Sequence, residues 1–214
     1  IDRGDAWDFD DDYRDQPEVF MTLTNSETTD FGDLVEVRQA YEFKNSKLVQ
    51  TIVIHKHDPI IRVYHDVDWK DSGYMLPFCY HDIVNTSWSE FMPQTWSDTV
   101  RSDIQFGYLD RPTTDNTEHE AAQYEICCQK WLDINDGKDG FAVINNVKNG
   151  YMAKQGIISL DLVRTFNYPC ENTDCHPIKY SYAIYLHVGV CNNIKIDELA
   201  KDFNGRFLFG NTAV

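Results

Sequence analysis

Residues 105–131 have the sequence QFGYLDRPTTDNTEHEAAQYEICCQKW, in which a polar loop separates two segments of alternating apolar and polar side chains. The apolar positions are Ile104, Phe106 and Tyr108 before the loop and Tyr124, Ile126 and Cys128 after it. A period of two residues predicts a half-buried strand on each side. Arg111-Pro112 interrupts the first strand because proline has no amide hydrogen, and the polar residues that follow are typical of a turn. The loop is therefore either an ordinary connection in an all-β protein or a place where a polar ligand binds.

Similar alternation recurs along most of the 214 residues, at 34–43, 48–54, 60–69, 141–144, 156–164 and 179–190. Residues 44–46 mark a hairpin turn with a connection of four to five residues, whereas residues 70–101 are the least periodic part and predict long loops with one or two strands. Only residues 194–203 have helical spacing. The pattern predicts an all-β fold, a large antiparallel β-sandwich with at most one short helix, and residues 1–214 are expected to form a single domain.

The charge balance excludes two classes of partner. Nineteen basic and thirty-five acidic residues give a formal net charge of −16. Such a surface repels both the phosphate backbone of nucleic acid and an anionic membrane. No apolar run approaches the length of about eighteen residues that a transmembrane helix needs. We therefore expect neither a nucleic acid nor a membrane partner.

Metal and nucleophile motifs are weak in this sequence. His55 and His57 lie two apart on a predicted strand and share a face, but no third zinc ligand is identifiable. The aspartates at 8 and 10–12 lack the glycine and terminal glutamate of a calcium loop, and they are expected to be a solvated acidic segment. No nucleophile and base pair stands out. From the residues alone, the sequence predicts no metal site and no catalytic residue.

The six cysteines are too few for a disulfide-dense scaffold. Cys127 and Cys128 are adjacent on a predicted strand, so their side chains should point to opposite faces. Cys170 and Cys175 flank a short loop and could pair in an oxidising compartment. Whether they do, and in which compartment the protein lies, stays open.

The order of residues in and around 105–131 resembles the α-mannosidases of glycoside hydrolase family 38. The pattern QFG-x-x-x-RPT-x-x-NT is followed by Tyr124-Glu125-Ile126 and by Lys130-Trp131-Leu132-Asp133. The resemblance continues at 140–151, 157–164, 168–169, 180–183 and His187, and upstream at 50–69 and Asp5-Ala6-Trp7-Asp8. It covers most of the chain and points to the cytosolic, vacuolar and bacterial branch, which favours a cytoplasmic or vacuolar location.

This resemblance implies a fold and a role. It is to the β-sandwich portion that follows the catalytic domain, a supersandwich like that of galactose mutarotase. The chain would then be the C-terminal β-domain of a zinc-dependent retaining α-mannosidase that hydrolyses terminal α-mannosyl residues of glycans. In the family, zinc and the nucleophile belong to an N-terminal barrel followed by a helical bundle. The chain would be a scaffold for that active site, with the catalytic domain and a mannose-containing glycan as partners, and inactive and free of zinc by itself.

The same resemblance nominates site residues. It places Asp5, Trp7 and Asp8 near the catalytic pocket, where Trp7 could stack on a sugar ring and the aspartates could accept hydrogen bonds from hydroxyls. The alternative is a strand-entry motif in which Trp7 is a core residue and the aspartates form a turn. Three further positions are expected to be structural: Arg111 paired with a carboxylate, Asn116 tying down its own turn, and Arg164 in an internal ion pair.

Two departures from the family pattern leave another function open. The loop 170–177, CENTDCHP, replaces an acidic segment, and residues 73–100 are longer and more polar than the family's compact strand. Trp88 and Trp96 lie in this irregular region. The alternative function is therefore a stand-alone carbohydrate-binding or assembly module without catalysis.

Overall fold

The computed structural model describes residues 20–71, 74–75, 82–83, 85–123, 125–165 and 175–209. These segments are almost entirely strands, which confirms the predicted all-β class. The strands are β1 (Thr22–Asp30), β2 (Leu34–Phe43), β3 (Ser46–His55), β4 (Ile60–Asp68), β5 (Tyr74–Met75), β6 (Asp82–Ile83), β7 (Asn85–Phe91), β8 (Thr99–Ile104), β9 (Gly107–Pro112), β10 (Glu125–Cys127), β11 (Trp131–Asn135), β12 (Asp139–Asn145), β13 (Gly150–Lys154), β14 (Ile157–Thr165) and β15 (Pro177–Val188).

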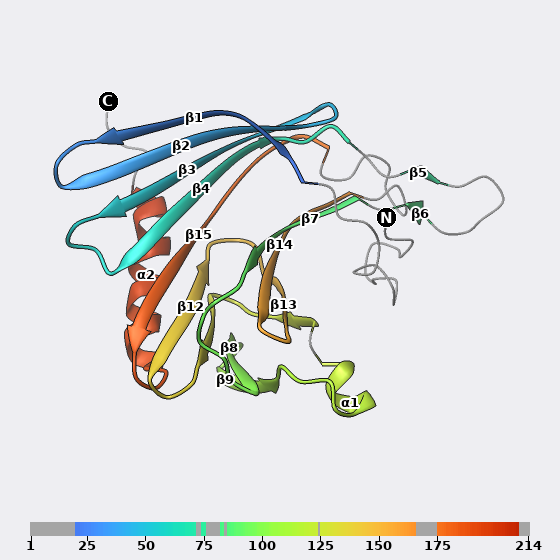
Figure 1. The fold of residues 1–214 in the computed structure, drawn as a ribbon, viewed down its shortest axis with the longest axis vertical. Coiled ribbons are helices and arrows are strands. Elements are labelled where there is room, and N and C mark those ends of the chain that lie inside the picture. Colours follow the sequence, from blue (N-terminus) through green and yellow to red (C-terminus); the bar gives the residue numbers. More distant parts are fainter. Residues whose placement is uncertain are drawn as a thin grey trace.

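Nine of these strands form one large antiparallel sheet in the order β1-β2-β3-β4-β15-β12-β11-β8-β9. Its central strand is β15, which comes near the end of the described chain and pairs with β4 on one side and β12 on the other. After β4 the chain alternates between this sheet and a smaller one, and β15 then joins β1–β4 to the half of the large sheet formed by β8, β9, β11 and β12. Figure 1 shows the large sheet as a broad curved layer running from the blue strands β1 and β2 to the green β8 and β9.

A second antiparallel sheet, β10-β13-β14-β7, covers part of one face of the large sheet. The core between the two sheets contains Val63 and Val67 from β4, Tyr182 from β15, and Tyr151 and Leu160 from the small sheet. The alternation at 60–69 predicts a strand with one shared apolar face, and Val63, His65, Val67 and Trp69 on that face are all buried. Alternation in β4 thus directs one row of side chains into this core. We call this the inner face of the large sheet.

The opposite, outer face carries helix α2 (Asn193–Phe209). Ile196, Leu199, Ala200 and Phe203 pack on apolar residues of β4, β11, β12 and β15. Asn192 caps the helix, since its Oδ1 accepts a hydrogen bond from the Lys195 amide at 3.1 Å. Figure 1 shows α2 in red on one side of the large sheet, with β7, β13 and β14 on the other. In the described part of the chain, no helix combines the length and apolar character needed to cross a membrane.

The helices and one turn correct the sequence predictions. The described chain contains two helices instead of at most one, because a single turn, α1 (Glu118–Ala121), forms where Thr117 caps the Glu120 amide. The second helix, α2, is longer than predicted, with 17 residues. The Lys44–Asn45 connection between β2 and β3 is also shorter than predicted, because β2 ends at Phe43 and β3 begins at Ser46.

A third correction concerns the stretch before the polar loop. Ile104, Phe106 and Tyr108 do not lie on one strand, because the chain turns at Gln105 and Phe106 between β8 and β9. Phe106 has a φ of 68° and is fully exposed. Arg111-Pro112 lies at the end of β9, which is an edge strand, the place in a sheet where proline is tolerated.

Candidate functional site

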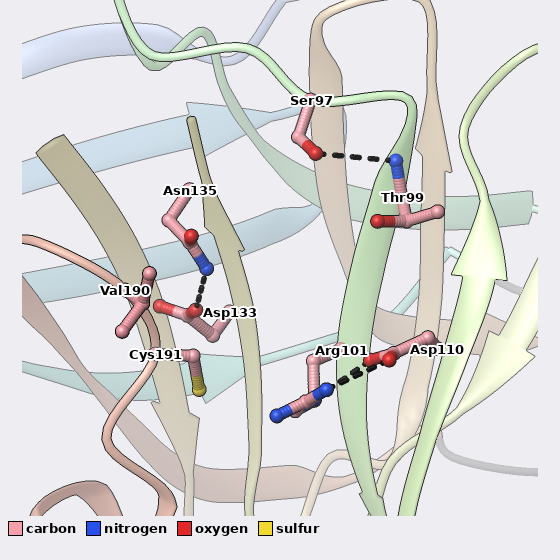
Figure 2. Close-up of a pocket in the computed structure, with 8 residues that line it drawn as sticks. All are labelled: Ser97, Thr99, Arg101, Asp110, Asp133, Asn135, Val190 and Cys191. Carbon is pink, nitrogen blue, oxygen red and sulfur yellow. Dashed lines mark hydrogen bonds and ion pairs between the residues drawn. The ribbon is translucent and has the colours of Figure 1, made fainter. Parts of the chain in front are cut away.

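A polar pocket of about 320 Å³ lies on the outer face, beside the start of α2. Four segments line it: β8 with the residues just before it, β9, β11, and the connection from β15 to α2. Figure 2 shows the lining residues, which are Ser97, Thr99, Arg101, Asp110, Asp133, Asn135, Val190 and Cys191. Only Val190 is aliphatic, so the pocket offers hydrogen-bonding groups on nearly every side.

Beneath the pocket lies a buried carboxylate, that of Asp133. Its side chain has no solvent exposure, and its two oxygens are occupied by His187 Nε2 at 2.7 Å and by Asn135 Nδ2 at 2.8 Å. A buried carboxylate is costly unless it is hydrogen-bonded, and these contacts meet that requirement. The bond from Asn135 also fixes the orientation of the amide that faces the pocket.

The contact between His187 and Asp133 depends on Gly140. Asn135, Gly140 and His187 stand directly opposite one another on β11, β12 and β15. A Cβ atom at Gly140 would lie 2.1 Å from Cε1 of His187, so any other residue there would displace the imidazole. The absence of a side chain lets His187 lie across β12 and reach the carboxylate on β11.

The side wall of the pocket is an ion pair between cross-strand neighbours. Arg101 of β8 faces Asp110 of β9 and binds it through two nitrogens, Nε and Nη2, each 2.7 Å from a carboxylate oxygen. These hydrogen bonds lower the pKa of Asp110 and raise that of Arg101. Arg101 Nη1 lies 3.4 Å from Asn193 Oδ1 at the start of α2. Both side chains are partly exposed, so the pair is accessible to a ligand.

Cys191 is not suited to act as a nucleophile in this pocket. Burial, together with the nearby charge of Asp133, raises the pKa of its thiol to about 12. The thiol instead donates to Asn193 Oδ1 at 3.1 Å. A glycosidase of the usual kind needs one carboxyl group that donates a proton and a second that reaches the sugar. Asp133 is inaccessible and Asp110 is held ionised by Arg101, so the geometry suits binding and not hydrolysis.

A second set of contacts ties α2 to the sheet beside the pocket. Asp197 of α2 accepts a hydrogen bond from Trp131 Nε1 at 2.9 Å and from Tyr108 Oη at 2.5 Å. Burial acts to raise the pKa of Asp197, but these two donors outweigh it and hold the pKa below its usual value. The tyrosine and tryptophan rings are also neighbours, with centroids 5.4 Å apart. These contacts fix the start of the helix beside the pocket.

The described residues that line the pocket include none of the site residues nominated by the sequence. Asp5, Trp7 and Asp8, like Cys170, are outside the described residues, so their proposed contacts stay predictions. Arg111 is half-buried on β9, and its Nε has no hydrogen-bond partner among the described residues. Arg164 is half-buried on β14, opposite Thr86 of β7. Their predicted ion pairs also stay predictions.

The turn around Asn116 is held mainly by Glu120. Its Oε2 accepts hydrogen bonds from the Asn116 amide at 2.9 Å and from Thr114 Oγ1 at 2.8 Å. Thr117 Oγ1 in turn accepts from the Glu120 amide at 3.2 Å. The polar loop of residues 113–118 is thus a capped turn, and the role predicted for the Asn116 side chain in holding it stays a prediction.

The structure also describes the two histidines and the two adjacent cysteines that the sequence analysis considered. His55 and His57 lie at the end of β3 with ring centroids 6.2 Å apart. Within the described segments, no group of three or more His, Cys, Asp or Glu side chains could hold a metal ion. These residues therefore do not fit a zinc site, and zinc stays a prediction from the family resemblance. Cys127, the last residue of β10, is exposed and Cys128, which follows the strand instead of lying on it, is buried.

The sequence contained part of the signal for the pocket. Asp133, Gly140 and His187 lie in the stretches that carry the family resemblance. The alternation of apolar and polar residues did not mark them as residues of a functional site. Arg101, Asp110 and Asn135 were not singled out. Their positions become informative only once the strand register is known, since it places Asp110, Arg101 and Asp133 opposite one another on three neighbouring strands.

Comparison with known proteins agrees with the fold and with the resemblance. The chain is 29% identical to alpha-mannosidase 2C1 of Mus musculus over 160 residues, which are 75% of this chain and 14% of the relative. It is 26% identical to alpha-mannosidase G of Dictyostelium discoideum over 168 residues, which are 78% of this chain and 14% of that relative. The chain thus spans about a seventh of the length of these relatives.

A solved structure and a family profile complete the comparison. The structure of an alpha-mannosidase from Enterococcus faecalis V583 superposes with a TM-score of 0.67 at 13% identity, over 86% of this chain and 24% of that one, which supports the fold. Residues 1–172 match the profile described as the glycosyl hydrolases family 38 C-terminal domain. Since that match covers most of the chain, the chain belongs to the family 38 glycosyl hydrolases, as their C-terminal domain.

Proposed function

We propose that the chain is the C-terminal β-domain of a longer α-mannosidase that removes terminal α-mannosyl residues from glycans. The match of residues 1–172 to the family's C-terminal domain carries this proposal. The similarity to alpha-mannosidases that are several times longer supports a partner region in the same protein. In this proposal the β-domain is a scaffold, and the bond-breaking groups belong to an N-terminal catalytic part.

An apolar row on the inner face supports the scaffold role. Val35, Ile54, Ile61 and Ile184 stand directly opposite one another on β2, β3, β4 and β15. Leu186 extends the row along β15, and it is 61% exposed, while Ile54 is 45% exposed. Exposed rows of aliphatic side chains mark surfaces where another protein part packs. We infer that the catalytic part covers this row.

Zinc enters the proposal only through the catalytic part. As the family resemblance implies, the zinc of the full-length enzyme is proposed to be bound by residues of the catalytic part. The proposed roles of Asp5, Trp7 and Asp8 at the edge of the active site belong to the same hypothesis. In it, the mannoside substrate is bound mainly by the catalytic part, and the β-domain contributes a few groups.

Hydrolysis of an aryl α-mannoside tests the proposal. The full-length protein should release the aryl group, a zinc chelator should abolish the reaction, and added zinc should restore it. The chain of residues 1–214 alone should show no turnover under the same conditions. Turnover by the isolated chain, or no hydrolysis by the metal-loaded full-length protein, would contradict the proposal. Tight mannoside binding by the isolated chain without any hydrolysis in the full protein would favour the stand-alone binding module.

A further inference from the structure

We propose that the outer-face pocket beside α2 is a binding site for a neutral polyhydroxylated molecule the size of a monosaccharide. The site goes beyond the proposed function, because it lies on the face opposite the apolar row and contains no catalytic group. Its lining comes from the β8–β9 hairpin, from β11 and from the β15–α2 connection, which are far apart in the sequence, so the pocket exists only in the folded domain. The inference rests on the kinds of groups that meet there and on how firmly they are held.

The accessible groups are matched to hydroxyls. Ser97 and Thr99 present side-chain oxygens, and Asn135 presents an amide whose orientation is set by Asp133 beneath it. The Asp110 carboxylate can accept hydrogen bonds from two hydroxyls, and the Arg101 guanidinium can donate to a third. Each hydroxyl of a sugar or polyol can both donate and accept a hydrogen bond. Adjacent hydroxyls can therefore bind the Asp110 carboxylate and the Arg101 guanidinium, which lie side by side.

These groups are also fixed before any ligand arrives. Arg101 is held by two hydrogen bonds to Asp110 and by its contact with Asn193, and Asn135 is held by the buried Asp133. Asp133 is held in turn by His187. Because these side chains lose little conformational freedom on binding, a small ligand with few atoms can still gain net affinity. Asp133 and His187 are therefore positioning residues.

Other ligand classes fit less well. An anion would meet the carboxylate of Asp110 and, below the floor, that of Asp133. A metal ion would need three or more suitable ligands, and no such group exists among the described residues. An apolar molecule would find only Val190 to contact. A neutral polyol avoids each of these costs, and the volume of about 320 Å³ is at the small end of the range for small-molecule sites.

Saturation-transfer NMR on the full-length protein tests the site with D-mannose and with myo-inositol as probes. Inositol has the same density of hydroxyls but no glycosidic or anomeric carbon, so it reports on polyol recognition separately from hydrolysis. Hydrogen exchange with and without saturating inositol then locates the bound probe. We expect millimolar binding of both probes and reduced exchange in β8, β9, β11 and the β15–α2 connection.

Two substitutions at Thr99 sharpen the test, because this side chain is exposed and lines the pocket. Thr99→Tyr fills the pocket and should abolish the inositol signal, whereas Thr99→Val removes only the hydroxyl and should weaken binding roughly threefold to tenfold. Thr28→Tyr on the exposed edge strand β1 is the matched control and should bind like the wild type. Absent inositol binding by the wild type, or equal binding by Thr99→Tyr and Thr28→Tyr, would overturn the inference. Either outcome would overturn the inference whether or not the full-length protein hydrolyses mannosides.

Discussion

Gly140 is the residue on which the floor of the pocket depends. The imidazole of His187 occupies the space where a side chain at position 140 would begin, and from there it reaches Asp133. This glycine is required by a close approach of a neighbouring side chain. The strand would accept another residue if His187 were absent.

Gly140→Ala should therefore destabilise the protein by about 2 to 4 kcal/mol, since the added methyl displaces His187 and leaves the buried Asp133 carboxylate with one partner fewer. Urea denaturation measures the change. Gly107→Ala is the control, because nothing lies within 4 Å of a Cβ atom there, and it should change stability by less than about 0.5 kcal/mol. Equal effects of the two substitutions would contradict the role given to Gly140.

His65 is a buried titratable residue in the core between the two sheets. Its ring is 4% exposed, lies against Tyr180 and Tyr182, and contacts Gln50 Oε1 through Nε2 at 2.8 Å. Burial lowers the pKa of His65 from 6.5 to about 4. The unfolded chain therefore takes up this proton at a higher pH than the folded chain does. The resulting stability is fully present above pH 6.5 and is lost as the pH falls toward 4.

Between pH 7 and pH 5 this residue alone should cost the folded protein about 2 kcal/mol of stability. The check is to compare the free energy of unfolding of the wild type and of His65→Phe at both values of pH. Carboxylates contribute to the pH dependence of both proteins, so the quantity of interest is the difference between their slopes. His65→Phe should be less stable at pH 7 but lose less on acidification. Parallel pH profiles would show that the pKa of His65 is the same in the folded and the unfolded chain, and would contradict this prediction.

At the scale of elements, α2 is fastened to the sheet by both apolar and polar contacts. Its apolar side chains pack on the outer face, and Asp197 joins the first turns of the helix to β9 and β11. Trp131 is completely buried, so its indole nitrogen needs the acceptor that Asp197 provides. The helix start beside the pocket is thus held by this carboxylate in addition to its apolar contacts and the contact of Asn193 with Arg101.

Asp197→Ala should destabilise the protein by about 1 to 3 kcal/mol, because it leaves the buried Trp131 nitrogen without a partner. Hydrogen exchange of the α2 amides should also become faster near the start of the helix. Glu198→Ala, at the exposed neighbouring position, is the matched control and should leave both quantities nearly unchanged. If exchange in α2 is the same in the two variants, the helix does not depend on this carboxylate.

Most elements could be predicted from the sequence because one face of each strand is buried. β4, β12, β14 and β15 follow the predicted ranges closely, since alternation there reflects the core on the inner face. The turn at Gln105 and Phe106 was missed because an exposed phenylalanine continued the apolar alternation. The extent of α2 was underestimated because Asn204 and Gly205, two poor helix formers, follow Phe203 directly.

The candidate site could be predicted far less well than the elements. Asp133 and His187 are 54 residues apart, and their contact depends on a glycine on the strand between them. No local pattern encodes such a contact, because it arises from the order of strands in the sheet. The family resemblance identified these stretches as characteristic, but only the register of β8, β9, β11, β12 and β15 shows why a carboxylate can be buried there.

At the scale of the molecule, the two faces of the large sheet have different roles. The outer face is covered by α2 and contains the polar pocket, while the inner face is covered by the small sheet and ends in the apolar row. An added charge in the apolar row should destabilise the full-length protein more than the same charge on an exposed strand. The reason is that the row is proposed to be covered by the catalytic part.

Ile54→Asp should lower the melting temperature of the full-length protein by several degrees, because it places a charge where the catalytic part is proposed to pack. Activity after brief heating should fall in parallel. Asn25→Asp adds the same charge on the exposed edge strand β1 and serves as the control. If the two variants melt at the same temperature, the row is not covered by another part of the protein.

The position of β15 late in the sequence also has a consequence during synthesis on the ribosome. Residues 1–172 match the family profile, yet the strand that joins the two halves of the large sheet comes after them. Until residue 177 emerges, β4 presents an unpaired edge to the cell, for roughly 5 to 20 seconds at ~5–20 residues per second. Open edges of this kind attract strands of other chains. A nascent chain of this protein is therefore expected to need protection by a chaperone over that interval, and a chain cut at residue 172 would need it permanently.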